Sequence, residues 1–113
     1  MRRGEIWVAN FSPWRGQEVG KARPSLILQA DWLTNLNSET ILVLPLTTQL
    51  WQGSEQLRIP LAARGRIKQR CYIMIDKMRA IDRRQFGQGP LTELTGDEMF
   101  TVERRLKVVL DLF

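Results

Sequence analysis

Short apolar runs punctuated by glycine and proline recur along the chain, which is typical of a protein built from short β-strands. The pattern predicts strands at residues 6–9, 25–29, 41–46, 57–61 and 72–75, with a continuation of the last one at 78–81. The run at 41–46 is the most apolar and predicts a central strand. Pro45 is expected to bend it near its end, because proline cannot donate to a ladder. Pro60 indicates that the strand around it lies at a sheet edge.

The C-terminal residues carry the clearest helical signal. Thr95 and Glu98 form a Thr-x-x-Glu capping box. Apolar residues then recur at helical spacing on one face, namely Met99, Val102, Leu106, Val109, Leu110 and Phe113. Shorter helical turns are expected at 31–36, with Asp31 as the N-cap, and at 82–86. Together these elements predict a mostly β (α+β) fold, a small and partly closed barrel of five to seven short strands with a C-terminal α-helix.

Residues 12–24 carry two glycines and two prolines and predict one long loop, with Pro24 opening the next strand. A loop of this length in a small domain is more often functional than incidental. Trp14 in this loop either packs on the body of the protein or stacks on a nucleobase, and the sequence leaves both alternatives open. The other three tryptophans are expected to serve packing rather than recognition: Trp7, Trp32 and Trp51.

The amino-acid composition excludes several kinds of catalytic and metal-binding site. The 113 residues predict a single domain spanning 1–113. Because the chain has no histidine, it cannot contain a Ser-His-Asp triad, a Cys-His pair or a histidine-ligated zinc. The single cysteine, Cys71, excludes an internal disulfide and a CxxC metal or redox site. We therefore expect neither a metal nor a cofactor, and any enzyme on this chain has to use Arg, Lys, Thr, Ser, Tyr, Asp or Glu.

The net charge of +5 and the sequence pI of about 10.1 make polyanions the first partners to consider, although the same charge serves solubility. A basic series occupies the second half of the chain, namely Arg64, Arg66, Lys68, Arg70, Lys77 and Arg79. It is either a solvated face or a groove that follows a nucleic-acid backbone. No stretch has the length of a membrane span or of a signal sequence, and a lone cysteine suits a reducing compartment, so a cytoplasmic protein is expected.

Several sequence blocks occur together in a characteristic order. They are Arg3-Gly4-Glu5-Ile6-Trp7, then Pro13, Gly16 and Glu18, then Lys21-Ala22-Arg23-Pro24, then Leu44-Pro45-Leu46-Thr47-Thr48, and then the series from Asp76 to Arg84. A Gly-x-Leu-Thr stretch at 89–92 follows. In this order and spacing the chain resembles the MazF/PemK (Kid) family of toxins from type II toxin-antitoxin systems, nearly from end to end.

The resemblance implies a homodimeric SH3-like barrel that acts as a sequence-specific endoribonuclease. Such toxins cut single-stranded RNA, usually mRNA, without a metal and leave 2′,3′-cyclic phosphate and 5′-hydroxyl ends. It also implies a cognate antitoxin with an acidic, disordered tail, and DNA binding by the toxin-antitoxin complex. The family's catalytic arginine falls on Arg23 and its catalytic threonine on Thr47. Two departures, Cys71 for the usual serine and Lys77 for the usual glutamine, mean that the relatives' cut-site preference does not carry over.

The chemistry of Arg23 and Thr47 fits this role. A guanidinium gives bidentate hydrogen bonds to phosphate oxygens, and Pro24 holds Arg23 in extended backbone. Thr47 is suited to bind a nonbridging oxygen or to orient the 2′-hydroxyl, although a threonine at a strand end also commonly caps the backbone. The general base is not identified, and Glu18 is the carboxylate to test. The remaining RNA-binding candidates are Trp14, Arg15, Lys21, Thr48, Gln49, Lys68, Arg70, Lys77 and Arg79.

A second class of function uses the same barrel without catalysis. The related gyrase-poison branch binds its target through the terminal helix and a final Trp-Gly-Ile. The present sequence reads Asp111-Leu112-Phe113 there and contains both the Arg-Pro and Thr-Thr elements. The sequence therefore favours the nuclease over the non-enzymatic binding module.

Overall fold

The computed structural model describes residues 1–11 and 22–112 of the chain. Among these residues the chain forms strands, two α-helices and two short 3₁₀ turns, and the predicted mostly β fold is confirmed. The strands are β1 (Glu5–Asn10), β2 (Ala22–Ile27), β3 (Thr40–Thr47), β4 (Arg58–Leu61), β5 (Cys71–Met74), β6 (Arg79–Asp82) and β7 (Thr92–Glu93). The helical segments are α1 (Asp31–Thr34), η1 (Glu55–Leu57), η2 (Arg83–Gln85) and α2 (Gly96–Val109).

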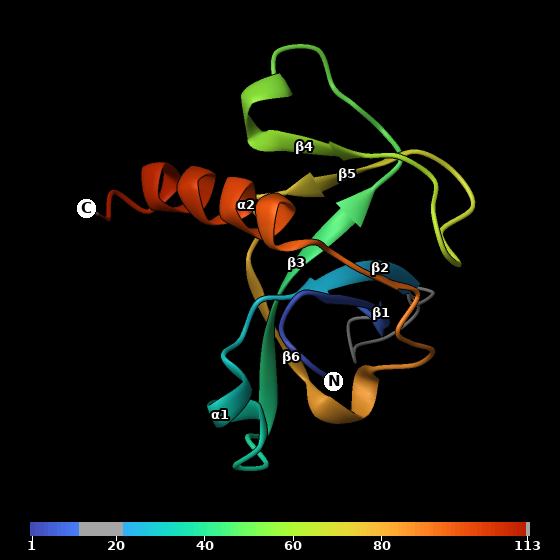
Figure 1. Ribbon diagram of the computed structural model, residues 1–113, viewed down its shortest axis with the longest axis vertical. Helices are drawn as coiled ribbons and strands as arrows, with labels where there is room; N and C mark the ends of the chain where they lie inside the picture. The colour runs from blue at the N-terminus through green and yellow to red at the C-terminus, as the bar shows by residue number, and fades with distance from the viewer. Residues whose placement is uncertain (12–21, 113) are drawn as a thin grey trace, which may run out of the picture.

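The strands join in one curled antiparallel sheet with the order β4-β5-β3-β2-β1-β7 (Figure 1). The longest strand, β3, is the organising element. Its first half pairs with β6 and its last two residues with β5, while its middle pairs with β2. No helix among the described residues is long and apolar enough to cross a membrane.

Of the two prolines at the centre of the sheet, Pro45 lies where the pairing of β3 changes near its end, in keeping with the prediction, whereas Pro24 does not open its strand. Pro45 does not end or interrupt β3, which continues through it to Thr47. It lies between Val43, the last residue paired with β6, and Leu46, the first paired with β5. On this side of β3 no partner strand pairs with Pro45, so the missing N–H of the proline costs no ladder hydrogen bond there. By contrast, β2 begins at Ala22 rather than at Pro24, which pairs with β1 just before the pairing with β3 begins.

Both faces of the sheet carry apolar clusters. The larger cluster gathers side chains from β1 to β5 beneath α2, including Ile6, Leu26, Leu44, Leu46 and Ile73. Val102 and Leu106 close it from the helix. The opposite face holds a smaller cluster of Ala9, Ile27, Ile41, Val43 and Ile81. The central strands are therefore buried on both sides, which explains their nearly continuous apolar sequence.

Helix α2 begins with the predicted capping box. The Thr95 hydroxyl accepts a hydrogen bond from the Glu98 amide at 3.2 Å, and the Glu98 carboxylate accepts one from the Thr95 amide at 2.8 Å. Arg64 also donates to Glu98, and this bond is the main reason that the pKa of Glu98 lies below its usual value, although burial opposes it. Arg64 further donates to Thr92 and to the Glu93 carbonyl. It therefore secures the start of the helix to the sheet.

The predicted apolar face of α2 is only partly correct. Met99, Val102 and Leu106 are buried, but Val109 and Leu110 are exposed, because the end of the helix projects beyond the sheet (Figure 1). Phe113 lies outside the described residues.

The two short helical turns also differ in detail. Helix α1 has Ala30 at its N-cap, and Asp31 is its first residue. The Asp31 carboxylate instead accepts a hydrogen bond from the Arg3 amide at 2.7 Å, so a tertiary contact replaces the expected cap. The turn predicted at 82–86 is η2, capped by Asp82. Hydrogen bonds from Arg84 lower the pKa of Asp82 to about 2.

The tryptophans among the described residues, Trp7, Trp32 and Trp51, divide into two groups. Trp7 packs against the smaller cluster, and its indole N–H donates to the Glu5 carboxylate at 3.0 Å, as a packing role requires. Trp32 and Trp51 are instead 68% and 65% exposed, so the prediction that they serve packing is wrong. Trp32 lies on the short helix α1 and Trp51 lies between β3 and η1, and neither segment reaches a core cluster at that position.

Replacing Gly89 by alanine is expected to destabilise the protein by about 1–3 kcal/mol, the usual cost of overpacking. A Cβ atom at position 89 would overlap the Trp7 indole, which is held by the smaller core cluster and by Glu5. Urea unfolding measures the effect. Gly96→Ala is the matched control, because a Cβ there meets nothing within 4 Å. Equal stability of the two variants would contradict this packing.

Candidate functional site

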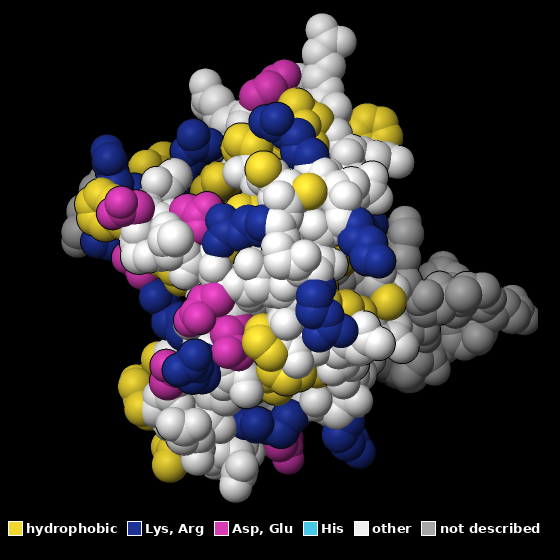
Figure 2. Space-filling view, turned by 45° about the vertical axis from the view of Figure 1, so that its right-hand side comes forward, with side chains coloured by type: hydrophobic (Ala, Val, Ile, Leu, Met, Phe, Trp, Pro, Cys, Tyr) yellow, Lys and Arg dark blue, Asp and Glu magenta, His cyan; other side chains and the backbone are white. Residues whose placement is uncertain are grey.

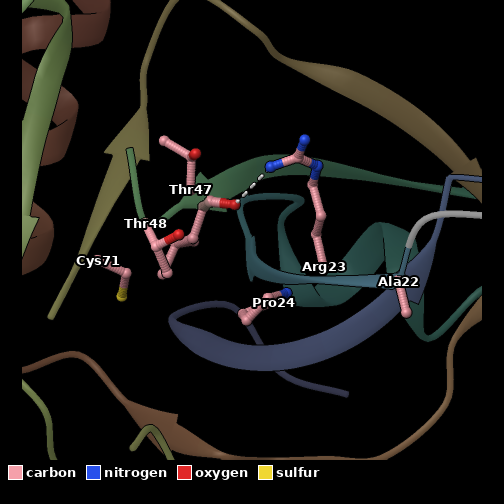
Figure 3. Close-up of a pocket in the computed structure, with 7 residues that line it drawn as sticks. Ala22, Arg23, Pro24, Thr47, Thr48 and Cys71 are labelled. Atoms are coloured by element: carbon pink, nitrogen blue, oxygen red, sulfur yellow. Dashed lines mark hydrogen bonds between the residues drawn. The ribbon is translucent and has the colours of Figure 1, made fainter. Parts of the chain in front are cut away.

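The strand register brings Arg23 and Thr47 together. Ser25 on β2 pairs with Pro45 on β3 in antiparallel register. Continuing that register by two residues places Arg23 opposite Thr47, and directly opposed residues project from the same face of a sheet. Figure 3 shows both side chains rising on the same side of the strands.

The Arg23 guanidinium is largely uncommitted within the part of the chain that the structure describes. Its only hydrogen bond there runs from Nη1 to the Leu46 carbonyl, at a long 3.5 Å (Figure 3). No described carboxylate lies within ion-pairing distance of it. Arg23 is half-buried, so its remaining N–H groups present a fixed positive charge to an anion.

Thr47 is the last residue of β3 and is half-buried. Its hydroxyl oxygen accepts a hydrogen bond from the Gln49 amide at 3.2 Å, which fixes the turn that leaves the strand. With one lone pair engaged in this way, the hydroxyl proton remains available to a ligand oxygen. The capping role anticipated for this threonine is therefore real, and it is compatible with binding.

A hollow of about 180 Å³ opens between the ends of β2, β3 and β5. Its lining consists of Ala22, Arg23, Pro24, Leu46, Thr47, Thr48 and Cys71. Thr48 and Cys71 point to the side of the strands opposite Arg23 and Thr47 (Figure 3). Cys71 is buried and its thiol faces the Leu61 carbonyl, and this burial raises the pKa of the thiol. It therefore stays a neutral, poorly nucleophilic group at neutral pH.

The basic side chains proposed to bind RNA differ in what they contact. Arg70, just before β5, places its guanidinium over the Tyr72 ring at 5.8 Å. Arg79 pairs with Val43 on β3 and stacks on Phe11 at 5.0 Å, on the face that carries Thr47. Lys77 approaches Asp76 at 3.8 Å, and Lys68 is exposed.

Arg64 does not belong with these basic candidates, since its guanidinium is committed to Glu98 and the Glu93 carbonyl. On the face drawn in Figure 2, Lys and Arg side chains stand in separate groups, several with Asp or Glu beside them.

The remaining candidates divide between exposed and undescribed residues. Thr48 and Gln49 are exposed immediately after Thr47. Four further candidates lie outside the described residues, namely Trp14, Arg15, Glu18 and Lys21. Among residues 1–11 and 22–112, no three His, Cys, Asp or Glu side chains gather in a way that could hold a metal ion.

One residue near the site was missed by sequence reasoning. Tyr72 on β5 pairs directly with Thr47 on β3. The available signal was its position beside Cys71 at the start of a predicted strand, but without the register nothing indicated which strand it would face.

The chain matches a family model described as the PemK-like, MazF-like toxin of type II toxin-antitoxin systems over residues 2–110. A MazE–MazF structure from Deinococcus radiodurans superposes with a TM-score of 0.80 at 24% identity, covering 100% of this chain and 97% of that one. The Mycobacterium tuberculosis toxin MazF-mt6 gives 0.77 at 20% identity, covering 96% and 98%. An endoribonuclease in complex with its cognate antitoxin, from a mycobacterial species, gives 0.76 at 18% identity, covering 100% and 97%. These structural matches establish the fold.

Proposed function

The chain belongs to the PemK-like, MazF-like family of toxins of type II toxin-antitoxin systems, and from this premise we propose that it is an endoribonuclease that cuts single-stranded RNA, messenger RNA in particular, without a metal ion. The observation that carries the proposal is the placement of Arg23 and Thr47 on one face at the ends of two neighbouring strands. The mycobacterial structure described as an endoribonuclease shares this fold, which is consistent with the same activity here.

The proposed reaction is attack of a ribose 2′-hydroxyl on the adjacent phosphate. Negative charge grows on the nonbridging oxygens as the five-coordinate phosphorane forms, and donors fixed in advance stabilise it. Arg23 supplies two such donors from one planar, positively charged group. Thr47 donates its hydroxyl proton to a nonbridging oxygen while its own oxygen is held by the Gln49 amide.

Two proton transfers complete the reaction. The 2′-oxygen must lose a proton and the departing 5′-oxygen must gain one. We propose that Arg23 mainly stabilises the charge of the phosphorane and only secondarily donates the proton to the 5′-oxygen. Proton donation is the lesser role because arginine is a very weak acid. No carboxylate lines the hollow among the residues described, so Glu18 remains the candidate for the base.

Wild-type protein is expected to cut single-stranded RNA in excess EDTA at the same rate as in Mg²⁺, because Arg23 and Thr47 perform the charge stabilisation that a metal supplies in other nucleases. Gel analysis of a long unstructured RNA measures both rates. The same RNA annealed to its complement is the control and should resist cutting. A rate that falls to background in EDTA and returns with Mg²⁺ would rule the mechanism out.

We further propose a homodimer, in keeping with the two-fold assemblies common among small proteins. Its partner is a cognate antitoxin with an acidic segment that is disordered when free. The net charge of +5 and the exposed Lys68, Arg70 and Lys77 support a polyanionic inhibitor. Two of the structures that share the fold contain an antitoxin.

A further inference from the structure

A row of side chains crosses the sheet at the level of Thr47. Thr47 pairs with Tyr72 on β5, and Tyr72 pairs in turn with Pro60 on β4. Arg23, on β2, lies on the other side of Thr47 when the printed β2–β3 register is continued by two residues. Opposed residues in an antiparallel pair project to one face with Cβ atoms about 4.5–5.5 Å apart. The Tyr72 side chain therefore rises next to Thr47, on the face that presents the Arg23 guanidinium.

Tyr72 is not a packing residue of the interior. It belongs to neither apolar cluster, and it is half-buried where its strand neighbours Cys71 and Ile73 are buried. Its hydroxyl has no hydrogen-bond partner among the residues that the structure describes. An aromatic ring held on a strand beside two phosphate-binding candidates, and not tied through its hydroxyl to any described residue, is suited to stack on a ligand.

The surroundings of the ring match a nucleobase. The Arg70 guanidinium lies 5.8 Å from the ring centroid and is itself exposed. Aromatic rings and arginine planes are the surfaces on which proteins stack splayed bases of single-stranded RNA. A base bound here would lie one strand away from the phosphate at Arg23 and Thr47, which is close enough for it to belong to a neighbouring nucleotide of the same RNA strand.

On this basis we propose that Tyr72, with Arg70 beside it, forms a stacking subsite for the base of a nucleotide adjacent to the cleaved phosphate. The proposal rests on the ribonuclease function proposed above and adds to it a residue that sets which base is accepted or how tightly it is held. Tyr72 acts by binding and has no part in proton transfer.

The experiment measures binding of an oligonucleotide whose sequence the wild type cuts, made uncleavable by a 2′-O-methyl group at the cut site. A series of such oligonucleotides carries one abasic nucleotide at each position in turn. The proteins are the wild type, Tyr72→Phe, Tyr72→Val and, as the matched control on the same strand and face, Met74→Val. Valine keeps the strand preference and removes the ring.

Tyr72→Val is expected to bind the intact oligonucleotide roughly 5- to 100-fold more weakly, while Tyr72→Phe and Met74→Val bind like the wild type. For the wild type, one abasic position next to the cut site should cause a loss of the same size, and in Tyr72→Val that position should cost nothing further. A ring that only supports the strand would instead weaken all oligonucleotides in parallel and leave the abasic pattern unchanged, which overturns the subsite.

Different results would overturn the Tyr72 subsite and the ribonuclease function. If the wild type cuts RNA and Tyr72→Val binds the whole series as the wild type does, the subsite is overturned and the ribonuclease function stands. If the wild type neither cuts nor binds RNA, the proposed function is overturned and the subsite with it.

Discussion

Replacing Arg23 by alanine is expected to slow RNA cleavage by about 10²–10³, the usual cost of losing one preorganised donor to a developing negative charge. Thr47→Ala should slow it by a similar factor, because it removes the second donor on the same face. The loss should appear in kcat more than in KM, since the charge that these groups stabilise exists fully only in the transition state. Single-turnover cleavage of a defined oligonucleotide measures it.

Both variants should remain folded. Arg23 makes one long hydrogen bond within the described part of the chain, and Thr47 is half-buried at a strand end. Arg84→Ala is the matched control for the loss of a positive charge, because Arg84 is exposed and pairs with its own neighbour Asp82. Wild-type cleavage by a folded Arg23→Ala or Thr47→Ala protein would remove that residue from the site. Equal slowing by Arg84→Ala would reduce the effect to net charge.

Replacing Asp76 by alanine is expected to destabilise the protein by about 3 kcal/mol. Its carboxylate accepts a hydrogen bond of 2.6 Å from Arg58, whose side chain is only 7% exposed. Arg58 also donates to the Leu57 carbonyl, while its Nε is buried without a partner among the described residues. Removing the carboxylate would leave a buried positive charge uncompensated, which costs more than the pair itself contributes. Urea unfolding with an unchanged m-value measures the loss.

The double variant Arg58→Met/Asp76→Ala tests whether such a loss comes from the uncompensated charge of Arg58. Removing both charges should recover much of the stability, because methionine fills the space of the arginine stem without a charge to bury. A double variant that is less stable than Asp76→Ala would contradict the account. It would mean that the arginine stabilises the β4–β5 region by packing alone.

Patterns that depend on local spacing were predictable from the sequence. The capping box at Thr95 and Glu98 and the positions of β1 and β3 to β6 required only the recognition of periodicity and turn residues. Predictions failed where a tertiary contact decides the local structure. Asp31 accepts a hydrogen bond from the Arg3 amide in place of capping α1, and β2 begins at Ala22 rather than at Pro24 because Ala22 already pairs with Asn10 on β1.

In the candidate site, too, local sequence patterns were predictable and tertiary contacts were not. Arg23 and Thr47 were found through sequence blocks, and the pairing of β2 with β3 then brought them to one hollow. Which charges face a ligand depends on partners far away in the sequence, so the commitment of Arg64 to Glu98 could not be foreseen. For the same reason Tyr72 was passed over, since its position beside Thr47 is a property of strand pairing.

The chemical ends of the cleavage products test the central claim most directly. If Arg23 and Thr47 stabilise attack by the neighbouring 2′-hydroxyl, every cut must leave a 2′,3′-cyclic phosphate on one fragment and a 5′-hydroxyl on the other. Mass spectrometry of the fragments from a defined oligonucleotide identifies both ends, and an otherwise identical substrate with 2′-deoxy nucleotides should remain intact. Fragments with 5′-phosphate ends, or cutting of the 2′-deoxy substrate, would show that water and not the ribose attacks the phosphate, and would contradict the account.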